Sequence, residues 1–237
     1  MKLDYKPKSE LEKFGQKVFN LLVENFPQTF YVGGMVRNLL LNKKVADIDI
    51  ATQVLPLEIV KLLSDSGIAC DSSSARFGVV TAKKGTHKIE ITTFRKDLPG
   101  KSRYPKVAFV KSSKIDSNRR DFSINALYFS PISGKILDFH QGLTDLKLKN
   151  LKFIGNPEKR IKEDPLRIIR ALRFAQTLNF KLETGSKSAI KNNFYLVETL
   201  TKLKIIKELG KIKSPKQRKL ILEIISKKTL DINKKLL

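Results

Sequence analysis

VADIDIAT, residues 45–52, is the segment that decides the fold of this chain. Apolar and polar residues alternate along it, which is typical of a β-strand with one face in the core. On such a strand Asp47 and Asp49 share one face and the isoleucines share the other. Two carboxylates held side by side repel each other unless a cation lies between them, and Mg²⁺ binds proteins through one or two carboxylates plus substrate phosphates. The segment indicates a strand that carries a Mg²⁺ site, although an exposed polar strand face gives the same pattern.

The segment just before this strand strengthens the first interpretation. Residues 29–32 predict a short strand, which runs into Gly33-Gly34 and then a helix over 35–41 that carries Arg37. Glycines let the backbone approach a ligand closely, and free N–H groups at the start of a helix favour phosphate. A Gly-Gly pair before a helix is also a common turn. The combination of Gly-Gly, arginine and two strand carboxylates is much rarer by chance and predicts a nucleotide phosphate site.

Further elements follow from periodicity and from turn residues. We expect an α+β protein in which a mixed β-sheet head, residues 1–150, is flanked by helices and followed by an all-helical neck, residues 151–237. The expected elements are helices over 9–25 and 56–66, a hairpin of 77–83 and 88–95, a mobile loop over 96–118, a helix over 121–129, a strand over 135–139, and helices from 143 onward, strongest at 158–178.

Two residues are candidates for a third catalytic carboxylate. Glu90 lies on the expected strand 88–95, on the face opposite Ile89 and Ile91, where it can bind a metal or accept the proton of an attacking hydroxyl. Asp121 precedes the expected helix 121–129 and is the alternative, although an aspartate at that place also serves as an N-cap. The sequence leaves the choice open.

An unusual run of charges begins at Asp164. It is followed by Arg167, Arg170 and Arg173 at intervals of three, which places all four near one side of a helix. Carboxylates only accept hydrogen bonds and arginines only donate them, so together they match the amino group and adjacent ring acceptor of cytosine or adenine. Asp164 as an N-cap, Pro165 at the first helical position and arginines on a solvated face explain the pattern equally well.

Composition adds a partner class but no reaction. The formal net charge of the 237 residues is +24, which favours nucleic acid, although lysine-rich proteomes also reach such values without a functional cause. The single cysteine, Cys70, excludes an intrachain disulfide and fits a cytoplasmic protein. We expect no membrane segment and no signal peptide, because no apolar run approaches about 20 residues.

These pieces, in this order, resemble the class II tRNA nucleotidyltransferase and bacterial poly(A) polymerase family, within the nucleotidyltransferase superfamily that includes DNA polymerase β. The resemblance runs from about residue 30 to about 180 and rests on five ordered motifs: Gly33-Gly34-Met35-Val36-Arg37, Asp47-Ile48-Asp49-Ile50-Ala51-Thr52, Ile91-Thr92-Thr93-Phe94-Arg95, Arg119-Arg120-Asp121-Phe122-Ser123-Ile124-Asn125-Ala126 and Glu163-Asp164-Pro165-Leu166-Arg167.

The resemblance implies roles for these residues. Asp47 and Asp49 would hold catalytic Mg²⁺ ions, with Glu90 or Asp121 as a further catalytic carboxylate. The residues that it implies for nucleotide binding and base selection are Gly33, Gly34, Arg37, Arg120, Asn125, Asp164, Arg167, Arg170 and Arg173. The reaction would be attack of an RNA 3′-hydroxyl on the α-phosphate of CTP or ATP.

Three departures from the family pattern stand out. The family usually has aspartate where this chain has Asn38, and it usually has glycine near 39–42, where the sequence reads Leu-Leu-Leu-Asn. Its members generally continue into helical body and tail domains, whereas this sequence ends at Leu237, so we expect these domains to be absent or minimal, or supplied by a partner.

The product is less well specified than the reaction. We favour complete or partial CCA addition to tRNA 3′ ends over poly(A) synthesis. A non-catalytic RNA-binding remnant of the family and transfer to a protein or small molecule are the other hypotheses. The oligomeric state is not indicated.

Overall fold

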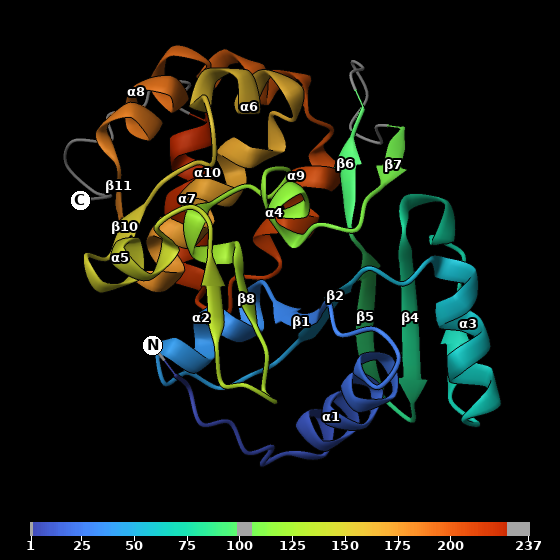
Figure 1. The fold of residues 1–237 in the computed structure, drawn as a ribbon. Helices are drawn as coiled ribbons and strands as arrows, with labels where there is room; N and C mark the ends of the chain where they lie inside the picture. Colours follow the sequence, from blue (N-terminus) through green and yellow to red (C-terminus); the bar gives the residue numbers. More distant parts are fainter. Residues whose placement is uncertain (1, 99–105, 227–237) are drawn as a thin grey trace. The chain divides into compact units, whose positions relative to one another are not determined.

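The computed structural model describes residues 2–98 and 106–226, and within them the chain divides into two compact units (Figure 1). The first contains residues 2–98, 106–120 and 124–142, and the second contains 121–123 and 143–226. Each unit has buried hydrophobic residues of its own. No described helix is both long and apolar enough to cross a membrane.

A seven-stranded mixed sheet forms the first unit, in the order β3-β4-β5-β2-β1-β8-β9. Of the pairings in this sheet, only that of β2 with β5 is parallel. The strands are β1 (Thr29–Val32), β2 (Ile48–Thr52), β3 (Ala69–Asp71), β4 (Val79–Lys84), β5 (His87–Thr93), β8 (Leu127–Phe129) and β9 (Ile136–Asp138). The predicted strands and the β4–β5 hairpin are confirmed, with small shifts at their ends.

Helix α1 (Glu10–Val23) covers one face of this sheet. Ser9 accepts a hydrogen bond from the Glu12 N–H, and the Glu12 side chain accepts one from the Ser9 N–H, which fixes the helix start. Gly15 allows close packing, because a Cβ there would lie 2.7 Å from Ile48 Cδ1. The apolar side of β2 is therefore sealed, which leaves the side that bears Asp49 for function.

The other helices of this unit follow the turn signals. Helix α3 (Pro56–Asp65) starts at a proline and is followed by Gly67 at φ +65°, and helix α2 (Gly34–Leu40) starts after Gly33 at φ +69°. A 3₁₀ turn, η1 (Ala75–Phe77), precedes β4. The predicted helices over 9–25, 35–41 and 56–66 are thus confirmed within one or two residues.

Two predictions for the middle of the chain are wrong. The described part of 96–118 contains the two-stranded sheet of β6 (Arg95–Asp97) and β7 (Val107–Phe109) and helix α4 (Ser113–Ser117), and only 99–105 lies outside the described residues. Residues 121–129 form a 3₁₀ turn, η2 (Ser123–Asn125), and strand β8 instead of a helix. All residues of β8 are buried, because β8 lies between β1 and β9 in the sheet, so tertiary pairing decided its conformation.

Over its described residues, 121–123 and 143–226, the second unit is helical apart from one short parallel pair of strands, β10 (Asn150–Leu151) and β11 (Lys181–Leu182). Its core includes Phe122, whose ring lies 4.7 Å from that of Phe153 and 5.7 Å from that of Phe174, centroid to centroid. The helical elements are α5 (Gly142–Lys147, which begins at the unit boundary), α6 (Pro157–Glu163), α7 (Leu166–Leu178), α8 (Thr184–Asn192), η3 (Phe194–Thr199), α9 (Lys202–Leu209) and α10 (Pro215–Ser226).

The strongest predicted helix, 158–178, is in fact two helices, α6 and α7. The break lies at Asp164, whose backbone is extended (φ −147°, ψ 97°). Proline disfavours the helical conformation in the residue before it, so Pro165 explains this break.

Candidate active site

Asp49 and Glu90 lie beside each other on the central strands of the first unit. They are register partners in the parallel pairing of β2 with β5, so their side chains project from the same face of the sheet. Asp47 is exposed and precedes β2 by one residue, because the strand begins at Ile48 instead of at residue 45. The structure thus pairs the predicted carboxylates Asp49 and Glu90 across the sheet, and Asp47 lies two residues before Asp49 in the chain.

The surroundings of Asp49 disfavour its negative charge. Burial and the nearby charge of Glu90 raise the pKa of Asp49 from 3.8 to about 7, and Arg120 and Arg37 only partly oppose them. The same sheet face carries the apolar cluster of Phe30, Val32, Ala51, Phe94 and Tyr128, which accounts for the poor solvation. An additional cation at Asp49 would relieve this unfavourable charge.

Gly33 provides space for the Asp49 carboxylate. A Cβ at Gly33 would lie 3.0 Å from Asp49 Oδ2 and 3.9 Å from a terminal nitrogen of Arg120, and its φ of +69° also favours glycine. The turn before α2 is therefore open toward Asp49 and Arg120. This is the close backbone approach that the Gly-Gly pair predicted.

Arg120 is held by two buried partners. Its Nε donates to the Tyr128 hydroxyl at 2.9 Å, and a terminal nitrogen lies 3.4 Å from Asp116 Oδ2. The Tyr128 hydroxyl in turn donates to Asp116 at 2.5 Å. The guanidinium carbon lies 5.0 Å from the centroid of the Tyr128 ring. Arg120 is thus fixed in orientation near Asp49.

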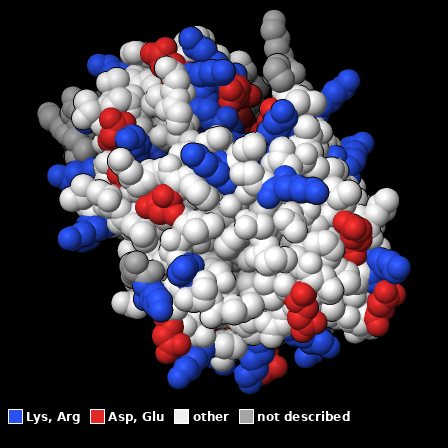
Figure 2. Space-filling model, viewed as in Figure 1, with Lys and Arg blue, Asp and Glu red and all other residues white. Residues whose placement is uncertain are grey.

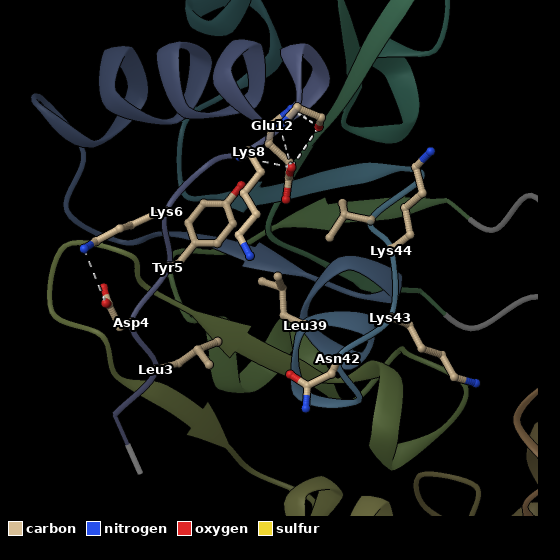
Figure 3. Close-up of a pocket in the computed structure, with 12 residues that line it drawn as sticks. Leu3, Asp4, Tyr5, Lys6, Lys8, Glu12, Leu39, Asn42, Lys43 and Lys44 are labelled. Atoms are coloured by element: carbon tan, nitrogen blue, oxygen red, sulfur yellow. Dashed lines mark hydrogen bonds and ion pairs between the residues drawn. The ribbon is translucent and has the colours of Figure 1, made fainter.

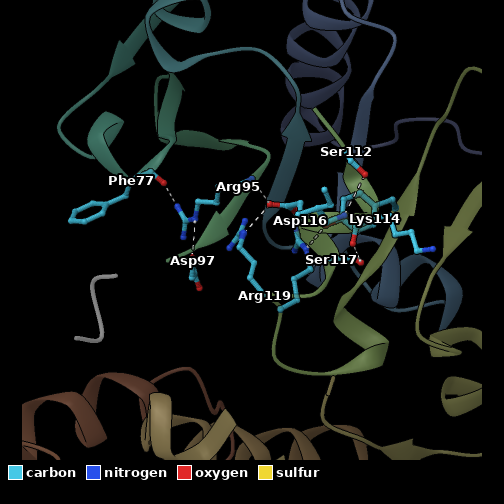
Figure 4. A network of polar contacts seen from close by, with 11 residues as sticks. Phe77, Arg95, Asp97, Ser112, Lys114, Asp116, Ser117 and Arg119 are labelled. Atoms are coloured by element: carbon cyan, nitrogen blue, oxygen red, sulfur yellow. Dashed lines mark hydrogen bonds and ion pairs between the residues drawn. The ribbon is translucent and has the colours of Figure 1, made fainter. Parts of the chain in front are cut away.

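Asp116 is one of the residues that the sequence analysis did not predict. Its carboxylate is fully buried, and it also accepts hydrogen bonds from the Arg119 Nε at 2.8 Å and from the Arg95 backbone N–H (Figure 4). Arg95 itself donates to the carbonyl of Phe77. The only signal in the sequence is the spacing of Asp116 from Arg119 and Arg120, since a buried acid at the end of α4 cannot be recognised from periodicity.

Arg37 is buried and oriented by two amides. It donates to Asn125 Oδ1 at 2.6 Å and to Asn38 Oδ1 at 3.0 and 3.3 Å. The Asn38 amide nitrogen donates to the Lys44 carbonyl at 3.3 Å. Asn38 thus provides the acceptor that an aspartate would provide, without its charge. A Cβ at Gly34 would lie 3.5 Å from Arg37 Nη2, so Gly34, Arg37 and Asn125 form one group.

The donor set around Asp49 suits Mg²⁺ in one specific way. Across residues 2–98 and 106–226, no three His, Cys, Asp or Glu side chains converge closely enough to hold a metal ion by themselves. Mg²⁺ typically binds through one or two carboxylates and takes its other ligands from water and substrate phosphates. Asp47 and Asp49, which are separated only by Ile48 in the sequence, fit this mode, and the negative charge of Asp49 is unfavourable without a cation.

The predicted residues of the second unit are engaged in ion pairs there. Arg170 binds the Asp121 carboxylate through Nη2 and through Nε at 2.7 Å. Arg173 Nε donates to Glu208 at 2.7 Å, and Lys211 binds the other oxygen of Glu208. Asp121 is therefore held by an arginine of α7, and no helix follows it for which it would act as an N-cap. Glu208 on α9 was not foreseen, because nothing in the local sequence links it to α7.

Asp164 and Arg167 lie at the junction of α6 and α7. Asp164 accepts a hydrogen bond from the Leu166 N–H at 3.2 Å and so helps to start α7, although Pro165 occupies the N-cap position. Arg167 donates to the Arg160 carbonyl at 2.7 Å and to Glu163 at 3.1 Å. Both side chains are partly exposed, so both are accessible to a ligand.

Several known proteins are similar to this chain in sequence. The CCA-adding enzyme of Lactobacillus helveticus (strain DPC 4571) is 40% identical over 191 residues, which are 78% of this chain and 46% of that enzyme. The CCA-adding enzyme of Lactococcus lactis subsp. cremoris (strain MG1363) is 36% identical over 217 residues, which are 90% and 52% of the two chains. The chain thus spans about half the length of these curated relatives.

Solved structures share the fold. The CCA-adding enzyme of Bacillus stearothermophilus in complex with CTP superimposes with a TM-score of 0.74 at 28% identity, over 86% of this chain and 49% of that one. A tRNA nucleotidyltransferase complexed with a primer tRNA and an incoming ATP analog gives 0.70 at 32% identity, over 90% and 59%. These likenesses confirm the predicted fold class.

The family itself is identified over more than half of the chain. The sequence pattern of the poly(A) polymerase head domain matches residues 29–152, which contain the strand carboxylates, the Gly-Gly turn and Arg120. The resemblance that the five motifs indicated is thereby confirmed, and the chain belongs to the poly(A) polymerase head-domain family of nucleotidyltransferases.

Proposed function

We propose that this protein adds C and/or A from CTP or ATP to the 3′ ends of tRNA, without a nucleic-acid template. The observation that carries the proposal is the register pairing of Asp49 with Glu90 on a sheet face where Gly33 and Arg120 also converge. Relatives named CCA-adding enzymes support CCA addition, complete or partial, over poly(A) synthesis.

The reaction is an in-line displacement. The 3′-hydroxyl of the RNA gives its proton to a base, a role that we assign to Glu90, and its oxygen forms a bond to the α-phosphorus of the nucleoside triphosphate. The bond from that phosphorus to the bridging oxygen breaks, and pyrophosphate leaves. Asp47 and Asp49 would hold Mg²⁺, which stabilises the attacking and leaving oxygens. Glu90 is the third carboxylate in this proposal, because it is paired with Asp49 whereas Asp121 is bound by Arg170.

The remaining residues bind and orient the nucleotide. Gly33 and Gly34 leave room for phosphate oxygens, and Arg120, fixed by Asp116 and Tyr128, donates to them in a preformed direction. Arg37 and Asn125 form the neighbouring pair of this cradle.

We assign residues 1–150 as the catalytic head and 151–237 as the neck. In the neck, Asp164 and Arg167 select the base, and Arg170 and Arg173 support them through the pairs with Asp121 and Glu208. A cytoplasmic location is part of the proposal, because a single cysteine and a tRNA substrate both fit a reducing compartment.

The test is incubation with Mg²⁺, a tRNA lacking its 3′ end, and labelled nucleoside triphosphates, singly and mixed. Two C residues and one A establish a CCA-adding enzyme, C alone or A alone a partial one, and open-ended A tracts a poly(A) polymerase. Asp47→Ala and Asp49→Ala are expected to abolish incorporation while circular dichroism stays unchanged. RNA binding without incorporation of any nucleotide would contradict the proposal and favour the non-catalytic remnant.

A further inference from the structure

A pocket of about 580 Å³ lies in the first unit, between the N-terminal segment and the loop that leads into β2 (Figure 3). One wall is formed by Tyr5 and Lys8, and the other by Leu39 and the loop over 42–45. None of its lining residues belongs to the proposed nucleotide cradle. Its volume is within the range of sites that bind small molecules or a segment of a larger ligand.

The N-terminal wall is firmly held in place. The Leu3 N–H donates to the Gly134 carbonyl at 2.8 Å, and the Tyr5 ring packs edge-on against Tyr31 and Phe129. Glu12 accepts hydrogen bonds from the backbone N–H groups of Lys8 and Ser9. In the described part of the chain the Tyr5 hydroxyl has no hydrogen-bond partner, so a polar atom of this wall is left unsatisfied.

The opposite wall is also defined by backbone hydrogen bonds. The Asn42 N–H donates to the Leu39 carbonyl at 3.1 Å, and the Lys43 N–H donates to the Asn38 carbonyl at 2.8 Å. Asn42 has φ +52°, a left-handed conformation that asparagine tolerates, and its exposed amide lines the pocket. Both walls are therefore formed before any ligand binds.

The pocket carries excess positive charge. Within the described residues the ammonium groups of Lys8, Lys43 and Lys44 make no ion pair. Of the acids that line the pocket, Glu12 is engaged by the backbone and Asp4 lies 3.9 Å from Lys6. Basic side chains also occur at many other places on the face shown in Figure 2, but four lysines, Lys6, Lys8, Lys43 and Lys44, line this one pocket.

The arrangement of these cations favours a chain of phosphates over a single one. Lys8 is directed into the space between the walls, whereas Lys43 and Lys44 extend outward from the opposite rim (Figure 3). A free nucleotide or pyrophosphate would be held by cations that converge on one point. Cations distributed along a rim match the successive phosphates of a polynucleotide.

The pocket is also close to the proposed active site along the chain. Val45 lines it and is two residues before Asp47, a span of at most about 7 Å. We propose that this pocket binds the RNA backbone upstream of the reacting 3′ end, with Lys8, Lys43 and Lys44 contacting phosphates. This inference rests on the proposed function, since it assigns the path of that RNA.

The experiment compares the full chain with a triple variant, Lys8→Gln/Lys43→Gln/Lys44→Gln. Fluorescence anisotropy measures its binding to a labelled tRNA transcript lacking the 3′ CCA at several salt concentrations. We expect the Kd to rise about tenfold near 100 mM salt and the log–log salt slope to become shallower by about 1 per lysine. The Kd and its salt dependence do not require catalysis. If the wild-type protein is inactive, the proposed function is contradicted, but the RNA-binding test of the pocket can still be carried out.

A matched triple variant, Lys17→Gln/Lys61→Gln/Lys88→Gln, removes the same charge from exposed sites of the same unit outside the pocket. We expect it to retain most of the affinity and slope. The KM for CTP and ATP shows whether the pocket binds the phosphates of a free nucleotide instead of those of RNA. We expect this KM to be unchanged in the pocket variant. Equal losses in the two triple variants, or a raised nucleotide KM with unchanged RNA affinity, would overturn the inference.

Discussion

Two buried carboxylates of the first unit have opposite electrostatic environments. Burial by itself would raise the pKa of Asp116. The charges of Arg119 and Arg120 and the hydrogen bond from the Tyr128 hydroxyl outweigh this effect and lower the pKa, so the carboxylate is a charged anchor at neutral pH. Burial and Glu90 raise the pKa of Asp49 to about 7, so its charge is unfavourable until a cation binds. Environments that separate the pKa values of neighbouring acids in this way mark functional sites.

Asp49→Asn is expected to stabilise the metal-free protein at high pH. Because the pKa rises from 3.8 in the unfolded chain to about 7 in the folded one, ionisation destabilises the folded state as the pH increases through this window. The variant should gain up to about 4 kcal/mol in unfolding free energy relative to wild type between pH 4 and pH 8. Urea denaturation followed by circular dichroism measures this difference.

Added Mg²⁺ provides the control for that measurement. At pH 8, millimolar Mg²⁺ should stabilise the wild-type protein and stabilise Asp49→Asn much less, because that variant retains only the exposed Asp47 carboxylate. If Asp49→Asn raises the unfolding free energy by the same amount at pH 5 and at pH 8, the pKa of Asp49 in the folded protein is not raised.

Asp116→Asn is expected to cost about 3 kcal/mol of stability and to raise the KM for nucleotide. The amide leaves Arg119 and Arg120 without their buried counter-charge, and Arg120 loses its fixed orientation. Asp97→Asn is the matched control, because Asp97 is exposed and lies 3.8 Å from Arg95, so its loss should change stability by less than about 0.5 kcal/mol. Equal effects of the two substitutions would exclude a positioning role for Asp116.

At the scale of elements, the turn into α2 is where local conformation and the site coincide. Gly33 and Gly67 both have φ near +65°, but a Cβ at Gly33 would lie 3.0 Å from Asp49 Oδ2, whereas a Cβ at Gly67 would meet nothing within 4 Å. Gly33 combines φ +69° with ψ −135°, a backbone region essentially restricted to glycine, so it is demanding both in its conformation and in its contact with Asp49.

Gly33→Ala and Gly67→Ala separate backbone strain from contact with the site. Both substitutions should lower stability, because alanine disfavours a positive φ, and Gly33→Ala should cost at least about 1–3 kcal/mol because its φ and ψ lie in a region essentially restricted to glycine. Only Gly33→Ala should lower kcat/KM, by a hundredfold or more, since its methyl group displaces the carboxylate of Asp49. Thermal melting and nucleotide incorporation measure the two effects, and equal activity of the two variants would contradict the role of Gly33.

The predicted elements succeeded where local signals decide conformation. Ser9 and Glu12 cap α1, Pro56 starts α3, and Gly85 marks the β4–β5 turn, so all three were predictable. Strand β8 was not, because its apolar residues fit a helix as well and only pairing with β1 and β9 selects the strand. Tertiary context overrides such local preferences.

The site was predictable in its residues and not in its pairings. Strand alternation placed Asp49 on the polar face, but the choice between Glu90 and Asp121 required the register of β2 with β5 and the ion pair of Asp121 with Arg170. Asp116 and Glu208 were not predicted because only their arginine partners distinguish them from exposed acids. Arg119 is three residues from Asp116 outside any predicted pattern, and Arg173 is far from Glu208 in the sequence.

At the scale of the whole molecule, charge is the dominant property. The net charge of +24 comes from 47 basic and 23 acidic residues, and among the described residues the buried acids Asp116, Asp121 and Glu208 are paired with arginines. The excess is therefore carried by exposed side chains, above all lysines. A surface of this kind attracts RNA through its phosphates whatever the sequence.

The affinity for tRNA is expected to fall by at least about a hundredfold between 50 and 200 mM salt, because binding releases counterions from several phosphates. Titrations with labelled tRNA at four or more salt concentrations give the slope. An unrelated tRNA with an intact 3′ end is the control and should show nearly the same slope, since the phosphates of both are equivalent. An affinity that does not respond to salt would exclude the phosphate backbone as the main ligand.

The parallel pairing of β2 with β5 also has a consequence for the order of folding. The chain between these strands contains α3, β3 and β4, so Asp49 and Glu90 meet through a contact between residues that are distant in the sequence. During synthesis on the ribosome, Asp47 and strand β2 with Asp49 emerge before β5. We therefore expect the pairing of Asp49 with Glu90, and with it catalytic competence, to form late in folding, because contacts between distant parts of a chain form slowly.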